Sequence, residues 1–258
     1  MKKINKMLPL VLSAILLISL LAACGGSGKT LEDIQGKGTL VIATSPDFPP
    51  FEYLEEGQVV GIEIDILKKA AQEMGVILDI QQMDFDSVIP GVQAGKFDLG
   101  ASGITANEKR KKNVDFSHAY FLASQAIVVT KDSPIASKAD LTGKKISVQT
   151  GTTAEDYCMQ SGYEVLAFTA NNDAAADLTA GKVDAWVVDN EVALVLAEQN
   201  DLQVLDEAMT SEPYAFAFPK ASQSLVDKFN DILDTMLEDG TVEAVFKEYG
   251  TPYVSPVA

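Results

Sequence analysis

Two stretches of this chain repeat one order of strand-like and helix-like segments, and this repetition limits its possible folds most. In the first stretch, an apolar segment at 40–44 precedes a helical pattern of apolar residues from Ile64 to Met74. Gly75 ends that helix, and a second apolar segment follows at 76–80. A short helix at 88–92 and a strand at 97–102 come next. Strands that alternate with helices predict an α/β fold with a parallel sheet.

The second stretch has the same order, from a strand at 145–149 through two helices to a strand at 183–188. Gly95-Lys-Phe-Asp-Leu99 and Gly181-Lys-Val-Asp-Ala185 then occupy equivalent places. We therefore expect two lobes, each a mainly parallel sheet flanked by helices. Extended segments at 126–130 and 214–218 would form a two-strand hinge, and helices at 225–237 and 242–249 would complete the first lobe. The predicted boundaries are 37–127 and 215–258 for lobe 1, and 128–214 for lobe 2.

The N-terminus has the features of an export signal. Three lysines precede an apolar run at 7–21, which is short for a membrane span, and Leu21-Ala-Ala-Cys24 follows. This last motif resembles the lipobox of bacterial lipoproteins, so we expect a signal peptide at 1–23 and a lipidated Cys24; a plain secretory signal is the alternative. Residues 24–36 would be the lipid anchor and a flexible tether. The protein would then be extracytoplasmic, on the outer face of a membrane of the Gram-positive type.

Composition excludes several classes of function. The formal net charge of −17 would become −20 after loss of residues 1–23, and such a surface repels nucleic acid. With Cys24 lipidated, Cys158 has no disulfide partner and is expected to be a buried structural thiol. His118 is the only histidine, and we place it in a loop, with no metal and no cofactor expected. The G-x-S-x-G and H-E-x-x-H motifs of common hydrolases are absent from the sequence.

Two segments read as capping boxes at helix starts: Thr105 with Glu108, and Thr152 with Glu155. The start of a helix attracts anions, because free N–H groups and the helix dipole both favour negative charge there. With Arg110 near the first, the pair suggests a clamp for a small carboxylate. The alternatives are that Arg110 belongs to a solvated basic run at 109–112 and that the threonines only cap helices.

The motifs along the mature chain together resemble the polar amino-acid-binding proteins of ATP-driven importers, the family 3 extracellular solute-binding proteins. The resemblance extends from residue 40 to about residue 250 and implies the type II periplasmic-binding-protein fold. It rests on the order and spacing of these segments: Phe48-Pro-Pro-Phe-Glu-Tyr53, Gly61-Ile-Glu-Ile-Asp65, Phe85-Asp-Ser-Val-Ile-Pro90, Ser102-Gly-Ile-Thr105 through Arg110, Val114-Asp-Phe-Ser117, Val148-Gln-Thr-Gly-Thr-Thr153, Gly181-Lys-Val-Asp184 and Asp239-Gly-Thr241.

The resemblance implies a site for a free amino acid. Arg110 would bind the α-carboxylate in a bidentate manner, together with the Thr153 N–H and the Thr152 hydroxyl. The α-ammonium would meet the Gly103 carbonyl, the Thr105 hydroxyl and Asp189. The remaining expected ligand-binding residues are two aromatic walls and two polar positions: Phe48, Phe85, Ser102 and Gln149.

Two departures concern the side-chain end of this pocket. Ser45 stands where many members that bind basic or glutamine-like side chains have Asp, which argues against a strongly basic ligand, and Gln149 stands where some members have Lys. We expect a polar or cationic amino acid, captured by a monomer and delivered to the permease subunits of an ABC importer. We expect no enzymatic activity. A dehydratase acting on prephenate or arogenate, or a sensor subunit for a separate receptor, is the alternative.

Overall fold

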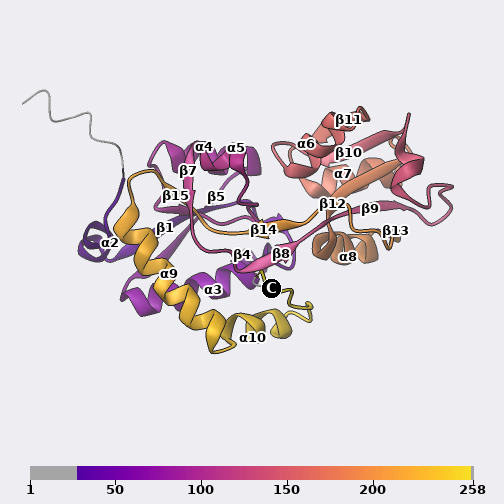
Figure 1. Cartoon of the computed structure of the whole chain (residues 1–258). Coiled ribbons are helices and arrows are strands. Elements are labelled where there is room, and N and C mark those ends of the chain that lie inside the picture. Colours follow the sequence, from indigo (N-terminus) through magenta and orange to yellow (C-terminus); the bar gives the residue numbers. More distant parts are fainter. Residues whose placement is uncertain (1–27, 257–258) are drawn as a thin grey trace, which may run out of the picture.

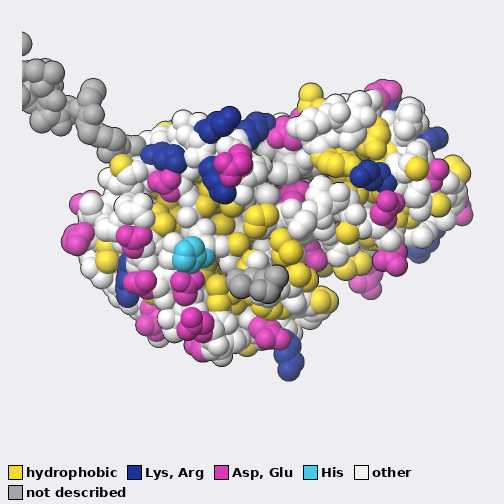
Figure 2. All heavy atoms as spheres, in the orientation of Figure 1, with side chains coloured by type: hydrophobic (Ala, Val, Ile, Leu, Met, Phe, Trp, Pro, Cys, Tyr) yellow, Lys and Arg dark blue, Asp and Glu magenta, His cyan; other side chains and the backbone are white. Residues whose placement is uncertain are grey.

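The computed structural model describes residues 28–256, so the predicted signal peptide at 1–23 and the lipidation site Cys24 lie outside the described residues. Two lobes lie side by side and are joined by a narrow two-stranded ribbon (Figure 1). Acidic side chains are spread over both lobes on the face drawn in Figure 2. No helix within 28–256 has the length and apolar character needed to cross a membrane.

The sheet of lobe 1 has five strands in the order β5-β1-β6-β15-β7. Their bounds are β5 (Ile77–Gln82), β1 (Thr39–Thr44), β6 (Leu99–Gly100), β15 (Ala217–Pro219) and β7 (Val114–Phe116). β1 is parallel to β5 and to β6, whereas β15 is antiparallel to both of its neighbours. Four strands therefore run one way and only β15, the returning strand, runs the other.

Lobe 2 repeats this plan in the order β11-β10-β12-β9-β13. The strands are β11 (Glu164–Phe168), β10 (Lys145–Gln149), β12 (Ala185–Asp189), β9 (Gln125–Thr130) and β13 (Leu202–Val204). β10 is parallel to β11 and β12, and β9 is antiparallel to β12 and β13. The predicted pair of α/β lobes with mainly parallel strands is confirmed, and each sheet is mixed because one reversed strand enters it.

The repeated Gly-Lys-x-Asp segment has the same role in both lobes. The Asp98 carboxylate accepts the N–H of Val41 at 2.7 Å, and the Asp184 carboxylate accepts the N–H of Lys145 at 2.8 Å. Each aspartate thus fixes the parallel strand beside it.

The ribbon between the lobes consists of β8 (Phe121–Ala123) and β14 (Glu212–Tyr214), paired antiparallel. We had expected the crossings at 126–130 and 214–218, and this expectation is wrong by several residues. Residues 125–129 are buried and form β9 inside lobe 2, and residues 217–219 form β15 inside lobe 1. Both segments are stabilised inside a sheet, where each has a partner strand on either side and buries its apolar side chains.

Helices cover both sheets. Lobe 1 has α3 (Ile62–Met74), α4 (Phe85–Gln93), the short α5 (Glu108–Lys111), α9 (Gln223–Glu238) and α10 (Thr241–Glu248), with a small sheet of β2 (Asp47–Phe48), β3 (Glu52–Glu55) and β4 (Gln58–Val60). Lobe 2 has the 3₁₀ turn η1 (Lys138–Leu141), α6 (Thr153–Gln160), α7 (Asn171–Thr179) and α8 (Asn190–Gln199). The apolar faces of α3, α9 and α10 belong to one buried cluster with β1.

A helix, α2 (Leu31–Lys37), occupies part of the segment for which we expected a flexible tether. Thr30 and Asp33 form a capping box at its start, and Ile34 is buried in the core of lobe 1. Since a buried apolar side chain and a cap both stabilise a helix, the expectation fails for residues 31–36.

The two residues placed outside the site behave as expected. Cys158 is a free, buried thiol whose pKa is raised to about 12 by burial. His118 lies in a loop, exposed, with Nδ1 2.8 Å from Asp234 Oδ1.

Candidate functional site

Nine of the ten predicted ligand-binding residues line one small cavity between the lobes. They are Phe48, Phe85, Gly103, Thr105, Arg110, Gln149, Thr152, Thr153 and Asp189. Phe48 to Arg110 come from lobe 1, and Gln149 to Asp189 come from lobe 2. The tenth residue, Ser102, is buried and does not line this cavity.

Gly103 brings the backbone of lobe 1 against the aromatic wall. Its φ is 53°, and a Cβ at this position would lie 2.4 Å from the Phe48 ring. Only glycine fits both conditions, because it has no Cβ and tolerates positive φ. This close approach holds the backbone of Gly103 beside the cavity.

The first predicted capping box is not formed. α5 begins at Glu108 with Asn107 as its N-cap, and the Asn107 side chain accepts the N–H of Arg110 at 2.9 Å. Asn is as good a cap as Thr and lies two positions nearer to the helix. The Thr105 hydroxyl is therefore free of capping, and it donates to Glu212 at 2.7 Å.

Arg110 is buried and reaches across the gap between the lobes. Its Nη1 donates to the Thr105 carbonyl at 3.1 Å and its Nη2 to the Gly151 carbonyl of lobe 2 at 3.2 Å. The guanidinium stacks over the Phe85 ring, 5.4 Å from the ring centre. Burial lowers the pKa of Arg110, and Glu212 and Asp189 oppose this shift, so the group keeps its charge. The interpretation of Arg110 as part of a solvated run is wrong.

The second predicted helix start is present, as α6 with Thr152 as N-cap. The Thr152 hydroxyl accepts the N–H of Glu155 at 3.2 Å and donates to the Gln149 carbonyl at 2.7 Å, so its only proton is already used. Thr153 is the first residue of the helix, and its N–H has no carbonyl partner within the helix. In this geometry the backbone of Thr153, rather than the Thr152 hydroxyl, offers a donor to an anion.

Asp189 ends β12 and lies at the start of α8, 6% exposed. Burial and the nearby charge of Glu212 raise its pKa to about 8, although Tyr214 and Gln125 lower it. Within the part of the chain that the structure describes, no donor meets its Oδ1 at hydrogen-bond geometry. A cation in the cavity would satisfy this oxygen.

Sequence reasoning missed Glu212, which is buried on the hinge strand β14. It accepts hydroxyl hydrogen bonds from three threonines, at 2.6–2.8 Å. The only signal in the sequence was an acidic residue close to an expected crossing, in no recognised motif.

Around the cavity the two lobes touch through polar side chains. Gln149 donates to Asp47 at 3.1 Å, and the N–H of Asn171 donates to the same carboxylate at 2.8 Å. At the surface, Lys109 forms an ion pair with Asp156 at 2.8 Å. The structure is therefore a closed arrangement, in which Gln149 points its amide at Asp47.

Ser102 connects the cavity wall to a buried pair of carboxyl groups. Its hydroxyl accepts the N–H of Ser45 at 3.1 Å and donates to Glu52 at 3.1 Å, and Glu63 accepts the Tyr120 hydroxyl at 2.5 Å. Burial raises the pKa of Glu63 to about 6, and burial with the charge of Glu63 raises the pKa of Glu52 well above its ordinary value.

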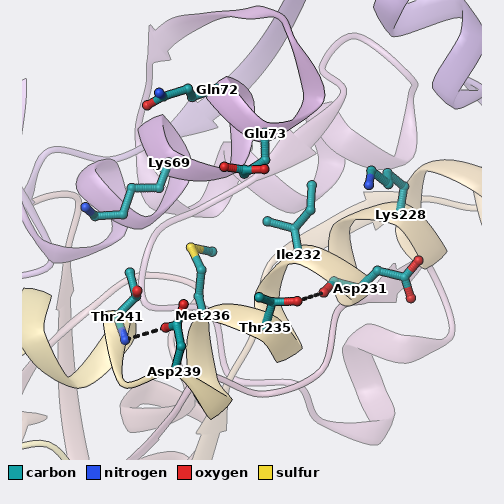
Figure 3. A pocket seen from close by; sticks show the side chains of 10 residues that line it. All are labelled: Lys69, Gln72, Glu73, Lys228, Asp231, Ile232, Thr235, Met236, Asp239 and Thr241. Carbon is teal, nitrogen blue, oxygen red and sulfur yellow. Dashed lines mark hydrogen bonds between the residues drawn. The ribbon is translucent and has the colours of Figure 1, made fainter.

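A more open hollow lies on lobe 1 between α3 and the α9–α10 corner, and it holds none of the predicted site residues (Figure 3). Its charged side chains are of both signs, among them Lys69, Lys228 and Asp231. Some of its polar groups already pair locally, since Asp239 accepts the N–H of Thr241 at 2.8 Å.

The comparison with protein families gives one match that spans most of the chain. Residues 40–252 match the bacterial extracellular solute-binding proteins, family 3. The arginine-binding extracellular protein ArtP of Bacillus subtilis is 36% identical over 250 residues, which cover 94% of this chain and 97% of ArtP.

Solved structures agree with this match. The chain superposes on a P235GK mutant of ArgBP from T. maritima with a TM-score of 0.82 and 36% identity, over 85% of this chain and 98% of that one. It is also similar to an ancestral amino acid-binding protein, a precursor of cyclohexadienyl dehydratase, with a TM-score of 0.80 and 35% identity over 85% and 98% of the two chains.

Proposed function

The chain belongs to the bacterial extracellular solute-binding proteins of family 3, and from this premise we propose that it captures one free polar or cationic amino acid between its lobes. The observation that carries the proposal is the cavity described above. Its lining combines one guanidinium, one buried carboxyl and two aromatic rings, which suits a small zwitterion.

The α-carboxylate would bind at the Arg110 end. On ligand entry, the two Arg110 nitrogens that donate to backbone carbonyls can turn to a carboxylate, and charge-assisted bidentate bonds are the stronger ones. The Thr153 N–H adds a donor from lobe 2, where the α6 dipole also favours negative charge.

The α-ammonium would bind at the opposite, acidic end. Asp189 supplies an unpaired oxygen, and the Thr105 hydroxyl and the Gly103 carbonyl supply neutral acceptors from lobe 1. Because the contacts come from both lobes, the ligand stabilises the closed form over the open one.

For the ligand side chain, we propose a cationic group, with arginine as the first candidate. The similar proteins ArtP and ArgBP are named for arginine. In this chain the Asp47 carboxylate accepts from Gln149, which lines the cavity, and it could accept from a guanidinium if Gln149 turned away. Phe48 and Phe85 offer faces on which a planar cation can stack.

A thermal-shift panel of the twenty amino acids with ornithine, citrulline and cystine tests this function directly. A ligand that binds only the folded form raises the melting temperature, and a 100-fold excess over Kd stabilises by about 2.7 kcal/mol. We expect arginine to give the largest shift. Shifts for leucine or phenylalanine alone, with none for polar amino acids, would contradict the proposal.

We further propose that lipidated Cys24 holds the protein at the outer face of the membrane, where it delivers its ligand to ABC permease subunits. Mass spectrometry of the native protein should find a lipid on Cys24, and Cys24→Ala should release the protein from the membrane fraction. Unchanged membrane association of that variant would contradict the anchor.

The similarity to the precursor of a dehydratase makes catalysis the second candidate to test. Loss of prephenate or arogenate on incubation with the protein would support it. Stable substrates, together with amino-acid binding in the panel, would support a binding protein.

A further inference from the structure

One oxygen atom of Glu212 accepts hydrogen bonds from hydroxyl groups of both lobes. Its Oε2 accepts from Thr105 of lobe 1 at 2.7 Å and from Thr153 of lobe 2 at 2.6 Å. Its Oε1 accepts from Thr210 at 2.8 Å, and the side chain is 6% exposed. The carboxylate therefore links the lobes from the hinge, independently of any ligand.

These hydrogen bonds determine whether each hydroxyl group can act as a donor or as an acceptor toward a ligand. A threonine hydroxyl has one proton and two lone pairs, so a Thr105 hydroxyl that donates to Glu212 keeps only acceptor capacity for a ligand. Without Glu212 the hydroxyl could rotate and present its proton to the cavity instead. An ammonium needs acceptors, so this orientation favours it.

The charge of Glu212 acts in the same direction. Of the charged groups near Asp189, Glu212 raises the pKa of Asp189 most. Of the charged groups near Arg110, Glu212 also raises the pKa of Arg110 most. Asp189 lines the cavity, and its buried Oδ1 has no hydrogen-bond donor among residues 28–256. A second carboxylate at this end attracts a cation and repels an anion, because charges interact strongly where water is excluded.

We propose, on the basis of the proposed function, that Glu212 is the positioning residue that makes the site select an α-amino group. It turns Thr105 into an acceptor, adds its charge to that of Asp189, and links Thr105 to Thr153 when the lobes are closed. A ligand with a carboxylate but no amino group then leaves the buried carboxyl groups of Asp189 and Glu212 without a cationic partner.

The test compares L-arginine with 5-guanidinopentanoate, which is the same molecule without the α-amino group. Calorimetry gives the ratio of the two Kd values for the wild type, Glu212→Gln, Thr105→Val and Thr105→Ser. Glu207→Gln is the matched control, because it removes an exposed negative charge five residues away. Circular dichroism verifies that each variant is folded.

We expect Glu212→Gln to reduce the preference for arginine at least tenfold, mainly by weakening arginine binding. Thr105→Val should act in the same direction, Thr105→Ser should keep the wild-type preference, and Glu207→Gln should leave the preference unchanged.

A purely structural role of Glu212 would weaken the binding of both ligands by the same factor. This result, which leaves the ratio of the two Kd values unchanged, overturns the inference. If Glu212→Gln does not fold, equal ratios for Thr105→Val and the wild type overturn it. The wild type is measured first, so failure to bind either ligand counts against the proposed function itself.

Discussion

Arg110 of lobe 1 donates a hydrogen bond to the carbonyl of Gly151 in lobe 2, at 3.2 Å, across the cavity between the lobes. The neighbouring residue, Lys109, also reaches lobe 2, but its ion pair with Asp156 is exposed to water. Two adjacent basic residues thus join the same two lobes, one buried and one solvated. This contrast provides an internal control for the role of Arg110.

Replacement of Arg110 by Ala should weaken amino-acid binding at least thirtyfold while the fold survives. Truncation of one partner of a buried charge pair costs about 2–5 kcal/mol. Lys109→Ala should change the affinity by less than about fivefold, since exposed ion pairs contribute about 0–1 kcal/mol. Calorimetry on both variants checks this, and equal effects would remove Arg110 from the site.

Amino-acid binding should release a proton near neutral pH. Burial and the charge of Glu212 raise the pKa of Asp189 to about 8, and Glu191, Tyr214 and Gln125 also act on it. A bound ammonium favours the charged carboxylate, so the proton leaves and the affinity rises with pH until about pH 8. Calorimetry in two buffers of different ionisation enthalpy measures the release.

The matched variant is Asp189→Asn, which keeps the shape of the side chain and removes its titration. It should bind weakly and release no proton. Equal binding enthalpies for the wild type in both buffers would show that Asp189 does not change its protonation on binding.

Gly103→Ala should impair binding more than stability. The added Cβ would lie 2.4 Å from the Phe48 ring in a residue with positive φ, so the ring and the loop at 102–105 must move. We expect an affinity loss of at least tenfold. Gly143→Ala is the control, because it has a φ of 73° but no atom within 4 Å of the added carbon. If both variants lose affinity equally, backbone strain rather than the Phe48 contact is responsible.

The Glu52–Glu63 pair should make the protein less stable as the pH rises through about 6. Burial raises the pKa of Glu63 from 4.5 to about 6, and burial with the charge of Glu63 raises that of Glu52 well above its ordinary value. The folded protein therefore binds more protons than the unfolded chain over this window. The free energy of unfolding therefore falls with increasing pH. Each Oε2 lacks another donor among the described residues, which a shared proton would correct.

Glu63→Gln keeps an acceptor for the Tyr120 hydroxyl and removes one titrating group. Its melting temperature should fall less between pH 5 and pH 8 than that of the wild type. Glu55→Gln, at an exposed position on β3, should follow the wild type. Parallel melting curves for all three proteins would rule out the pair as a source of pH dependence.

The repeated pattern of strands and helices predicted the two lobes, because periodicity and glycine stops are local signals. The Gly-Lys-x-Asp segments even have matching hydrogen bonds at Asp98 and Asp184. The first crossing was displaced in the prediction because β8 and β9 are neighbouring extended segments rich in apolar residues, so only their pairing partners distinguish them.

Within the site, the motif residues met at one cavity, but their hydrogen bonds could not be predicted from sequence. Thr105 and Thr152 both looked like helix caps, and only Thr152 is one, since Asn107 caps α5. Glu212 belongs to no recognised motif, and its two partners at the site lie 107 and 59 residues away along the chain, so the sequence does not indicate its role.

The position of β15 between β6 and β7 also has a consequence for the order of folding after export. Lobe 2 contains all five strands of its sheet within residues 125–204, so it can close as soon as that segment is available. The sheet of lobe 1 is complete only when residues 217–219 pair with β6 and β7, and these residues lie about a hundred positions after β7 in the sequence. Closing so long a loop has an entropic cost that precedes the favourable contacts of β15. The lobe that carries Arg110 is thus the last to assemble, and a chain cut before β15 leaves the edges of β6 and β7 unpaired and open to association with other chains.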